Sequence, residues 1–411
     1  MGGECQIRST SSAAALFRHT PFLLFFTARA CSRFCYQIGA VAVGWQVYAL
    51  TNSALDLGLI GLTQFVPMAL LVFVAGHAAD RFDRRRVAQA SQIAAAATAA
   101  FLAFGSFAGW LDVPEIFGAV AILGMTAAFE SPTTAAMLPL VAPEGMLQRA
   151  TAVSSATVQV ATIVGPALGG LTYAASPALP YAIISVVWLI AAAVNGAIML
   201  AAQPARTETA TLASLFAGVG FVRRNPLILG SISLDLFAVL LGGVTALMPI
   251  YARDILHIGP WGLGILRGAP AVGAMGMATL LARTTMTRRV GLRMFQAVIV
   301  FGLATVVFAL SRWLWLSVLA LIVLGAADMI SVVIRLSLVQ LKTPDAMRGR
   351  VGAVNYLFIN TSAQLGEFES GIAAALLGAV PAAALGGLGT IAVALLWMKL
   401  FPPLRDVDRL E

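Results

Sequence analysis

Apolar runs of about 20 residues recur from one end of this 411-residue chain to the other. Each run is long enough to cross the roughly 30 Å hydrocarbon core of a bilayer as an α-helix. Charged residues make up only 11% of the chain, whereas a soluble globular domain carries about 25%. The sequence therefore predicts an all-α membrane protein that crosses the bilayer many times.

These runs predict twelve transmembrane spans. They lie near residues 22–50, 54–79, 87–110, 116–140, 150–174, 179–201, 226–252, 260–282, 291–311, 313–340, 351–378 and 381–401. A polar segment, 203–225, divides the spans six and six. We therefore expect an N-terminal six-helix bundle over residues 1–202, a cytoplasmic linker over 203–225 and a C-terminal six-helix bundle over 226–411.

The net charge of +8 is explained by where the basic residues fall. If the N-terminus is cytoplasmic, nearly all basic residues outside the spans lie on cytoplasmic loops and tails, and only Arg253 and Arg312 lie on the other side. This asymmetry is the one that keeps positively charged loops of membrane proteins in the cytoplasm. We expect both termini to be cytoplasmic, and the basic charge to report topology rather than a nucleic-acid partner.

Residue types that carry covalent chemistry are scattered. His19, His77 and His257 are far apart and form no metal-ligand pattern. Cys31 and Cys35 share one helix face, where two packed small residues explain them better than a metal or redox pair. The chain has no Ser-His-Asp set, no phosphate-cradling loop and no nucleotide motif. The sequence thus predicts neither an enzyme nor a cofactor, and any transport must draw on a gradient.

The two halves repeat one another. PEGMLQRATAV (143–153) matches PDAMRGRVGAV (344–354) at a shift of 201 residues. Near a shift of 203, Pro67 meets Pro270 and Tyr48 meets Tyr251. Two parallel six-helix repeats with a substrate path between them are a known transporter architecture.

The loop GHAADRFDRRR (76–86) concentrates charge between two apolar runs. It resembles the signature loop between the second and third helices of the major facilitator superfamily, G-x-x-x-D-R/K-x-G-R-R/K. The matching residues are Gly76, Asp80, Arg81, Arg84 and Arg85. Asp83 replaces the second glycine of the signature, which puts the tight turn of the loop in doubt.

The resemblance covers the whole chain. FLLFFTAR (22–29), LDLFAVLLGG (234–243) and LKTPDAMRGRVGAV (341–354) are similar to the branch that contains the enterobactin exporter and related drug exporters. The resemblance implies a multi-pass protein of the bacterial inner membrane. It also implies that Asp80 and Arg81 form a latch against the helix beginning near Arg350 when the cytoplasmic side is closed. The alternative is that the arginines only fix topology.

Charged residues inside spans are costly and usually serve a function. Nine such residues lie within the predicted spans: Arg29, Arg33, Glu130, Asp235, Arg267, Asp328, Arg335, Glu367 and Glu369. Glu130 and Asp328 lie near the middle of spans that correspond in the two halves. Asp235 corresponds to a position between Arg29 and Arg33, and Asp328 shares a helix face with Arg335.

A carboxyl group that exchanges an arginine partner for a drier, protonated state can carry a proton. We expect Glu130 and Asp328 to do so first and Asp235 third, with static ion pairs as the alternative. Glu367 and Glu369 are two residues apart, so both cannot face one cavity. Arg267 lies one turn before Pro270 and could extend outward, so no role is assigned to it.

VGPALGG (164–170) resembles the fifth-helix signature of proton-driven exporters, G-x-x-x-G-P-x-x-G-G. Gly165, Pro166, Gly169 and Gly170 match, and Ala161 replaces the upstream glycine. The alternative is a packing seam, because proline kinks a helix and glycines allow close helix contact. The resemblance favours export over import.

These observations predict a proton-coupled exporter that alternates access around a site at mid-membrane. Its expected partners are a siderophore-like metabolite or amphipathic drug, protons and membrane lipid, and we expect a monomer without a metal. One rival is a lipid or lysolipid flippase on the same fold, which would need a lateral opening and few acids in its cavity. Another is a sensor or scaffold that would tolerate loss of Glu130 and Asp328.

Overall fold

The computed structural model describes residues 13–199, 212–284 and 288–409, together with most of their side chains. Every regular element in these ranges is helical, so the all-α prediction is confirmed. Six helices form one half of the molecule: α2 (Thr20–Thr51), α3 (Ala54–Arg81), α4 (Arg84–Ala108), α5 (Val113–Val141), α6 (Leu147–Ala175) and α7 (Leu179–Gly196). The short α1 (Ala13–Arg18) lies against the start of α2.

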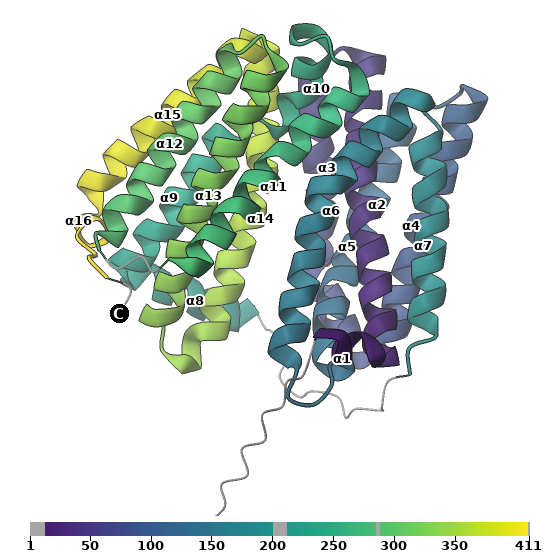
Figure 1. Ribbon diagram of the computed structural model, residues 1–411, viewed down its shortest axis with the longest axis horizontal. Helices are drawn as coiled ribbons and strands as arrows, with labels where there is room; N and C mark the ends of the chain where they lie inside the picture. Colours follow the sequence, from purple (N-terminus) through teal and green to yellow (C-terminus); the bar gives the residue numbers. More distant parts are fainter. Residues whose placement is uncertain (1–12, 200–211, 285–287, 410–411) are drawn as a thin grey trace, which may run out of the picture.

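The second half is built from α9 (Pro226–Gly242), η1 (Thr245–Leu247), α10 (Met248–Ile250), η2 (Tyr251–Ile255), α11 (Gly259–Arg283), α12 (Val290–Leu310), α13 (Leu314–Lys342), α14 (Asp345–Leu377) and α15 (Ala379–Leu400). Two short helices, α8 (Leu212–Arg224) and α16 (Pro402–Arg405), flank it. The two halves stand side by side in Figure 1. The N-terminal half is purple to teal, and the C-terminal half is green to yellow.

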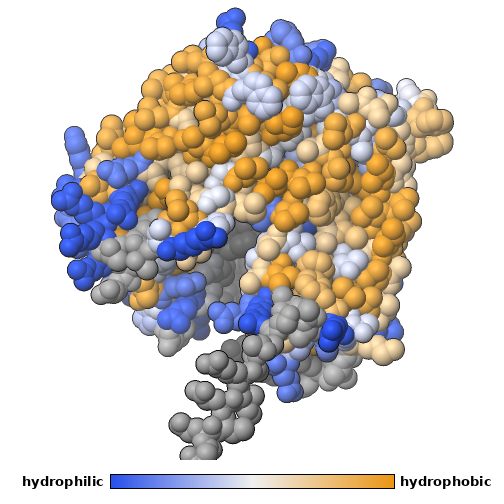
Figure 2. Space-filling model, in the orientation of Figure 1, coloured by the Kyte–Doolittle hydropathy of each residue, from blue (hydrophilic) through white to orange (hydrophobic). Residues whose placement is uncertain are grey.

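Ten segments in the described ranges are helical, long and apolar enough to cross a membrane. One of these is the run Pro226–Ile255, which is not a single helix but α9, η1, α10 and η2 in succession. The helices α2 and α14 lie in the same bundles with 32 and 33 residues, or about 48 Å at 1.5 Å per residue. Each carries charged side chains within its length, Arg29 and Arg33 on α2 and Glu367 and Glu369 on α14. Figure 2 shows a broad apolar band across one face, with hydrophilic residues gathered at its two ends.

Local sequence signals account for the helix boundaries. The Ser53 side chain accepts the Asp56 backbone N–H and begins α3, and Asn52 ends α2 in a left-handed conformation at φ 51°. Asp83 begins α4 in the same way by accepting the Arg85 backbone N–H at 3.0 Å. Its φ is −58°, so the turn needs no glycine there, and the departure from the signature loop is explained by helix capping.

The two ends of the molecule differ. One end, here called the basic end, carries α1, the loop between α3 and α4, α8 and the start of α14. In Figure 1 the ribbons of the two halves diverge toward this end, which lies at the bottom, and converge at the top. Glycines at the basic end, Gly76 of α3 and Gly349 of α14, face open space. The halves therefore meet mainly at the other end, which we call the opposite end.

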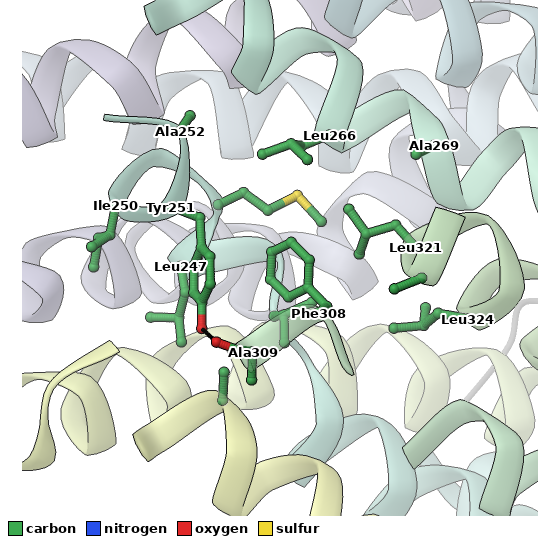
Figure 3. Packing of buried hydrophobic residues seen from close by; sticks show 14 of the residues in the cluster. Leu247, Ile250, Tyr251, Ala252, Leu266, Ala269, Phe308, Ala309, Leu321 and Leu324 are labelled. Atoms are coloured by element: carbon green, nitrogen blue, oxygen red, sulfur yellow. Dashed lines mark hydrogen bonds between the residues drawn. The ribbon is translucent and has the colours of Figure 1, made fainter. Parts of the chain in front are cut away.

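Glycines allow the close approach at the opposite end. A Cβ atom on Gly371 of α14 would lie 2.7 Å from the Gly58 Cα of α3. A Cβ on Gly170 of α6 would meet the Pro260 carbonyl oxygen at the start of α11. A hydrophobic cluster lies beside these seams and includes Val41 and Leu57 of the N-terminal half. Figure 3 shows its C-terminal part, where Tyr251 donates to the Ala309 carbonyl at 3.0 Å.

Candidate functional site

A cavity of about 570 Å³ lies between the two halves, within the size range of sites for small organic ligands. Both halves line it with apolar and polar side chains. The N-terminal half contributes α2, α3, α5, α6 and α7, and the C-terminal half contributes the broken segment after α9, α11, α13 and α14. Its charged and amide-bearing wall residues are Gln37, Gln64, Gln159, Arg267, Asp328, Gln364 and Glu367.

Some of these polar side chains form hydrogen bonds within the wall, and others carry a buried atom without a hydrogen-bond partner among the described residues. Gln37 donates to the Thr162 hydroxyl at 3.1 Å within the N-terminal half. Gln159 donates to the Ala271 carbonyl at 3.0 Å and thereby joins the two halves. The Gln364 Oε1 and the Arg267 Nε are buried without a hydrogen-bond partner among the described residues. A buried polar atom left this way is a group that a bound molecule can satisfy.

The helix is interrupted after α9, and the residues that follow the interruption lie at the cavity. Gly243 ends α9, and Thr245, Ala246, Met248 and Pro249 then line the cavity. The Gly243 carbonyl is satisfied by the Ser370 hydroxyl of α14 at 2.7 Å. Irregular backbone at membrane depth is tolerated where it is buried in protein or lines a cavity, and in transporters it marks the binding region.

Glu130 lies behind the cavity wall rather than in it. It is 5% exposed, and it accepts hydrogen bonds from the Tyr36 hydroxyl at 3.1 Å and the Gln92 amide at 2.9 Å. Gln92 in turn accepts from Asn195 of α7 at 2.8 Å. Tyr36 itself lines the cavity, so this residue links the cavity wall to Glu130.

Arg29 and Arg33 lie on α2, the helix that also carries Tyr36. Arg29 interacts electrostatically with Glu130, and its Nε is buried without a hydrogen-bond partner among the described residues. Arg33 repels Arg29 and interacts with Tyr36. Neither arginine lines the cavity. The polar cluster of the N-terminal half thus surrounds Glu130 on the side away from the cavity.

The buried ion pair of the C-terminal half joins Asp235 of α9 to Arg335 of α13, at 3.1 Å. Arg335 also donates to the Asn355 side chain at 2.9 Å. Asp328 shares a helix with Arg335, but it lines the central cavity and also a small pocket that contains Asp235. The sequence placed Asp328 and Arg335 on one face, and it did not indicate that Asp235 is the residue paired with Arg335.

The residues of the signature loop make contacts within the N-terminal half. Arg85 pairs with Asp83 at 3.1 Å and donates to the Ile198 carbonyl at 2.9 Å, and Arg84 donates to the Ala136 carbonyl at 3.4 Å. Arg81 is exposed at the end of α3, and Gly76 borders open space. The side chain of Asp80 lies outside the described residues. The latch remains a prediction for the state in which the basic ends approach.

The small residues of the VGPALGG segment lie against two helices, α2 and α11. A Cβ on Gly165 would be 2.5 Å from the Gln37 Cβ, and a Cβ on Gly169 would be 2.9 Å from the Ile38 carbonyl oxygen, both on α2. Gly170 faces α11, and Pro166 lines the cavity. The segment therefore supports the close packing of α6 on α2 and α11, next to the cavity.

Two cavity residues had no role assigned from the sequence. Arg267 of α11 and Glu367 of α14 both line the cavity and attract one another electrostatically. Glu367 lies against Gly61 of α3, whose Cβ would be 2.8 Å from the Glu367 Oε2. Glu369 is not among the lining residues. The sequence feature that could have indicated the position of Glu367 is Gly61, because a glycine on α3 leaves room for a carboxylate on a facing helix.

Within the described ranges, no three His, Cys, Asp or Glu residues gather where they could hold a metal ion. Cys35 is buried, and its thiol donates to the Ile184 carbonyl at 3.6 Å. The arrangement is suited to binding and releasing a molecule, because it combines an apolar wall, neutral amides and a few charged groups.

A model of the family described as transmembrane secretion effector matches residues 11–410. The chain therefore belongs to this family of major facilitator transporters, and the resemblance read from the sequence is confirmed. Its relatives include the enterobactin exporter EntS of Citrobacter koseri, 28% identical over 94% of this chain and 93% of that protein. EntS of Escherichia coli is 26% identical, again over 94% of this chain and 93% of that protein.

Solved structures share the fold. One is a bacterial homologue of the human lysosomal transporter Spinster, in an inward-facing and unoccupied conformation. The match covers 95% of this chain and 99% of the homologue's chain, with a TM-score of 0.72 and 12% sequence identity. Another is the nucleoside transporter NupG, where the match covers 93% of this chain and 100% of the NupG chain, with a TM-score of 0.74 and 13% sequence identity. The chain is a multi-pass inner-membrane transporter of a small molecule.

Proposed function

We propose that this transporter is a proton-coupled exporter that moves its cargo by alternating access. The observation that carries the proposal is the cavity between two halves that meet at the opposite end and diverge at the basic end. Alternating access needs such a site and two states that expose it to one side at a time. The geometry is that expected of one of these two states.

The basic end is proposed to face the cytoplasm. It carries Arg84, Arg85 and Arg86 at the start of α4, and Arg223 and Arg224 at the end of α8. Positively charged segments next to spans are retained on the cytoplasmic side. With this orientation both termini are cytoplasmic, and cargo enters the cavity from the cytoplasm while the opposite end is closed. Export is further supported by the VGPALGG resemblance and by the exporter relatives.

The proposed cargo is a siderophore-like metabolite or an amphipathic drug. The cavity wall offers amide donors and acceptors beside apolar surface such as Val43 and Leu57, which suits a molecule with both characters. The relatives named as enterobactin exporters support the siderophore class. Because one chain contains both walls of the cavity, a monomer is sufficient for the cycle.

Glu130 and Asp328 are proposed as the proton carriers, one in each half. Asp328 reaches the cavity directly, whereas Glu130 reaches it through Tyr36. Asp235 is a weaker candidate because it does not line the cavity and is held in a buried ion pair with Arg335 at 3.1 Å. Arg29 and Arg33 would compensate the charge of Glu130 when it is deprotonated. The latch of Asp80 and Arg81 would act at the basic end in the other state.

The first experiment measures proton release from the lumen of acidified inside-out vesicles with a pH-sensitive dye. A panel of siderophores and of cationic or amphipathic drugs is added to the medium. We expect at least one compound to dissipate the gradient with the native protein, and at least a tenfold smaller rate with Glu130→Gln or Asp328→Asn. An essential protonatable group gives losses of this order or larger.

The matched control is Asp112→Asn, which changes an exposed carboxylate at the start of α5, the helix that carries Glu130. This variant should release protons at the native rate. Proton release that is unaffected in both Glu130→Gln and Asp328→Asn would contradict the assignment of the carriers. Movement of labelled lysolipid without any proton release would replace the exporter proposal with the flippase.

A further inference from the structure

A second large pocket lies on the outer surface of the C-terminal half. It measures about 480 Å³ and is formed by α11, α12 and α13, which lie next to one another in Figure 1. Both α11 and α12 pack against α13, so α13 is the floor of a groove whose walls are the other two helices. The groove and the central cavity share no lining residue, since they lie on different faces of α13.

Small residues keep this groove open. The floor consists of Ala326 and Ala327 of α13, with Ala297 at the base of the α12 wall. On α11, Gly276 borders open space beside Met277, which forms the facing wall. The rest of the lining is apolar, with Val300 and Val323 toward mid-membrane. A groove of this kind, open at the side of a bundle, faces lipid rather than water.

The polar groups of the groove are gathered at one end. Arg293 lies in the first turn of α12, at the basic end, and Gln296 follows one turn further into the membrane. Arg293 is exposed, and its guanidinium forms no hydrogen bond or ion pair with the described residues. From Arg293 to Val300 the groove runs seven residues along α12, or about 10 Å at 1.5 Å per residue.

We propose that this groove binds one anionic phospholipid. The lipid phosphate lies on Arg293 and Gln296, and one acyl chain lies between α11 and α12. Arginine is suited to phosphate because its guanidinium offers several donors to the same anion. Basic pockets between transmembrane helices on the cytoplasmic side bind anionic headgroups. The apolar length of the groove below Arg293, a cation without a partner among the described residues, distinguishes a lipid from a free phosphate.

The proposed site belongs to one half only. A shift of 203 residues relates Arg288 and Arg289 of the C-terminal half to Arg85 and Arg86 of the N-terminal half. At the same shift, Arg293 corresponds to Ala90, and Gln296 corresponds to Ile93. The N-terminal half therefore lacks both polar groups at the related place. The inference does not depend on the transported molecule or on proton coupling, because it concerns a surface that the central cavity does not reach.

The test compares lipids retained by the purified full-length protein in uncharged detergent, counted by native mass spectrometry. The probes are phosphatidylglycerol and phosphatidylcholine of equal chain length. We expect preferential retention of one phosphatidylglycerol, and about a fivefold loss of affinity in Arg293→Gln, since one basic residue near the membrane contributes about 1 kcal/mol toward an anionic lipid. Lys399→Gln is the matched control, because Lys399 is an exposed cation at the basic end of α15 outside the groove.

A second variant separates the groove from the charge. Ala326→Leu fills the floor and leaves Arg293 in place, so it should also reduce phosphatidylglycerol binding. Equal retention in Arg293→Gln and Lys399→Gln would overturn the proposal. So would equal binding of the two lipids by the native protein. Competition by inorganic phosphate at the same concentration as the lipid would show a headgroup contact without an acyl site, and would also overturn it.

Discussion

Asp235→Ala is expected to destabilise the protein by about 3–5 kcal/mol, the cost of leaving a buried charge without its partner. Arg335 is 1% exposed, and its Nε already lacks a hydrogen-bond partner among the described residues. Without the carboxylate 3.1 Å away, the guanidinium would keep the neutral oxygen of Asn355 as a hydrogen-bond partner and its electrostatic interaction with Asp328. The readout is the midpoint of thermal unfolding in detergent, followed by tryptophan fluorescence.

The matched control for this prediction is Asp406→Ala. Asp406 pairs with Arg405 at 2.8 Å, a shorter distance than in the buried pair, but both side chains are exposed. Exposed pairs contribute little to stability because water and salt screen them. The double variant Asp235→Leu with Arg335→Met should recover most of the lost stability, since apolar replacements of a buried pair are often neutral. Equal effects of Asp235→Ala and Asp406→Ala would contradict the prediction.

Gly371→Leu is expected to open the opposite end. Even a Cβ there would lie 2.7 Å from the Gly58 Cα and 2.9 Å from the Ala54 carbonyl oxygen. Both contacts are with backbone atoms of α3, so α3 and α14 must separate. Overpacking of this kind costs about 1–3 kcal/mol. If that cost falls only on the state closed at this end, it shifts the equilibrium by about 5- to 150-fold.

The shift is measured with a single cysteine at Gln64, a cavity residue, in a background with the three native cysteines replaced. An impermeant maleimide added from outside the cell should label it at least tenfold faster in Gly371→Leu. Net transport of the cargo should be lost, because one of the two states is disfavoured. Gly118→Leu is the control, since Gly118 is exposed on α5 with nothing within 4 Å. Equal labelling in both variants would mean that the α3–α14 seam does not close this end.

Several features followed from the order of residues alone. A bilayer leaves no water for backbone groups, so each long apolar run must form a helix, and the all-α fold could be predicted before any tertiary information. The internal repeat and the GHAADRFDRRR loop identified the superfamily, which the family match confirms. The span predicted near 226–252 lies within the apolar segment Pro226–Ile255, and the structure adds that the first helix of this segment ends at Gly242 and Gly243.

The partners of the intramembrane charges were decided only by the tertiary structure. Asp235 and Arg335 are 100 residues apart, and their contact depends on how α9 and α13 are rotated and tilted against each other. Glu130 and Asp328 correspond in the repeat, yet Tyr36 separates Glu130 from the cavity while Asp328 faces it.

For the same reason Arg267 and Glu367 had no assigned role until α3, α11 and α14 were placed around one cavity. A residue's depth in the membrane is set by counting along a helix, and therefore the sequence by itself determined it. The direction of its side chain changes by about 100° with each residue and with every break in the helix. Which charges meet, and which face the cavity, was thus decided by the packing of helices distant in sequence.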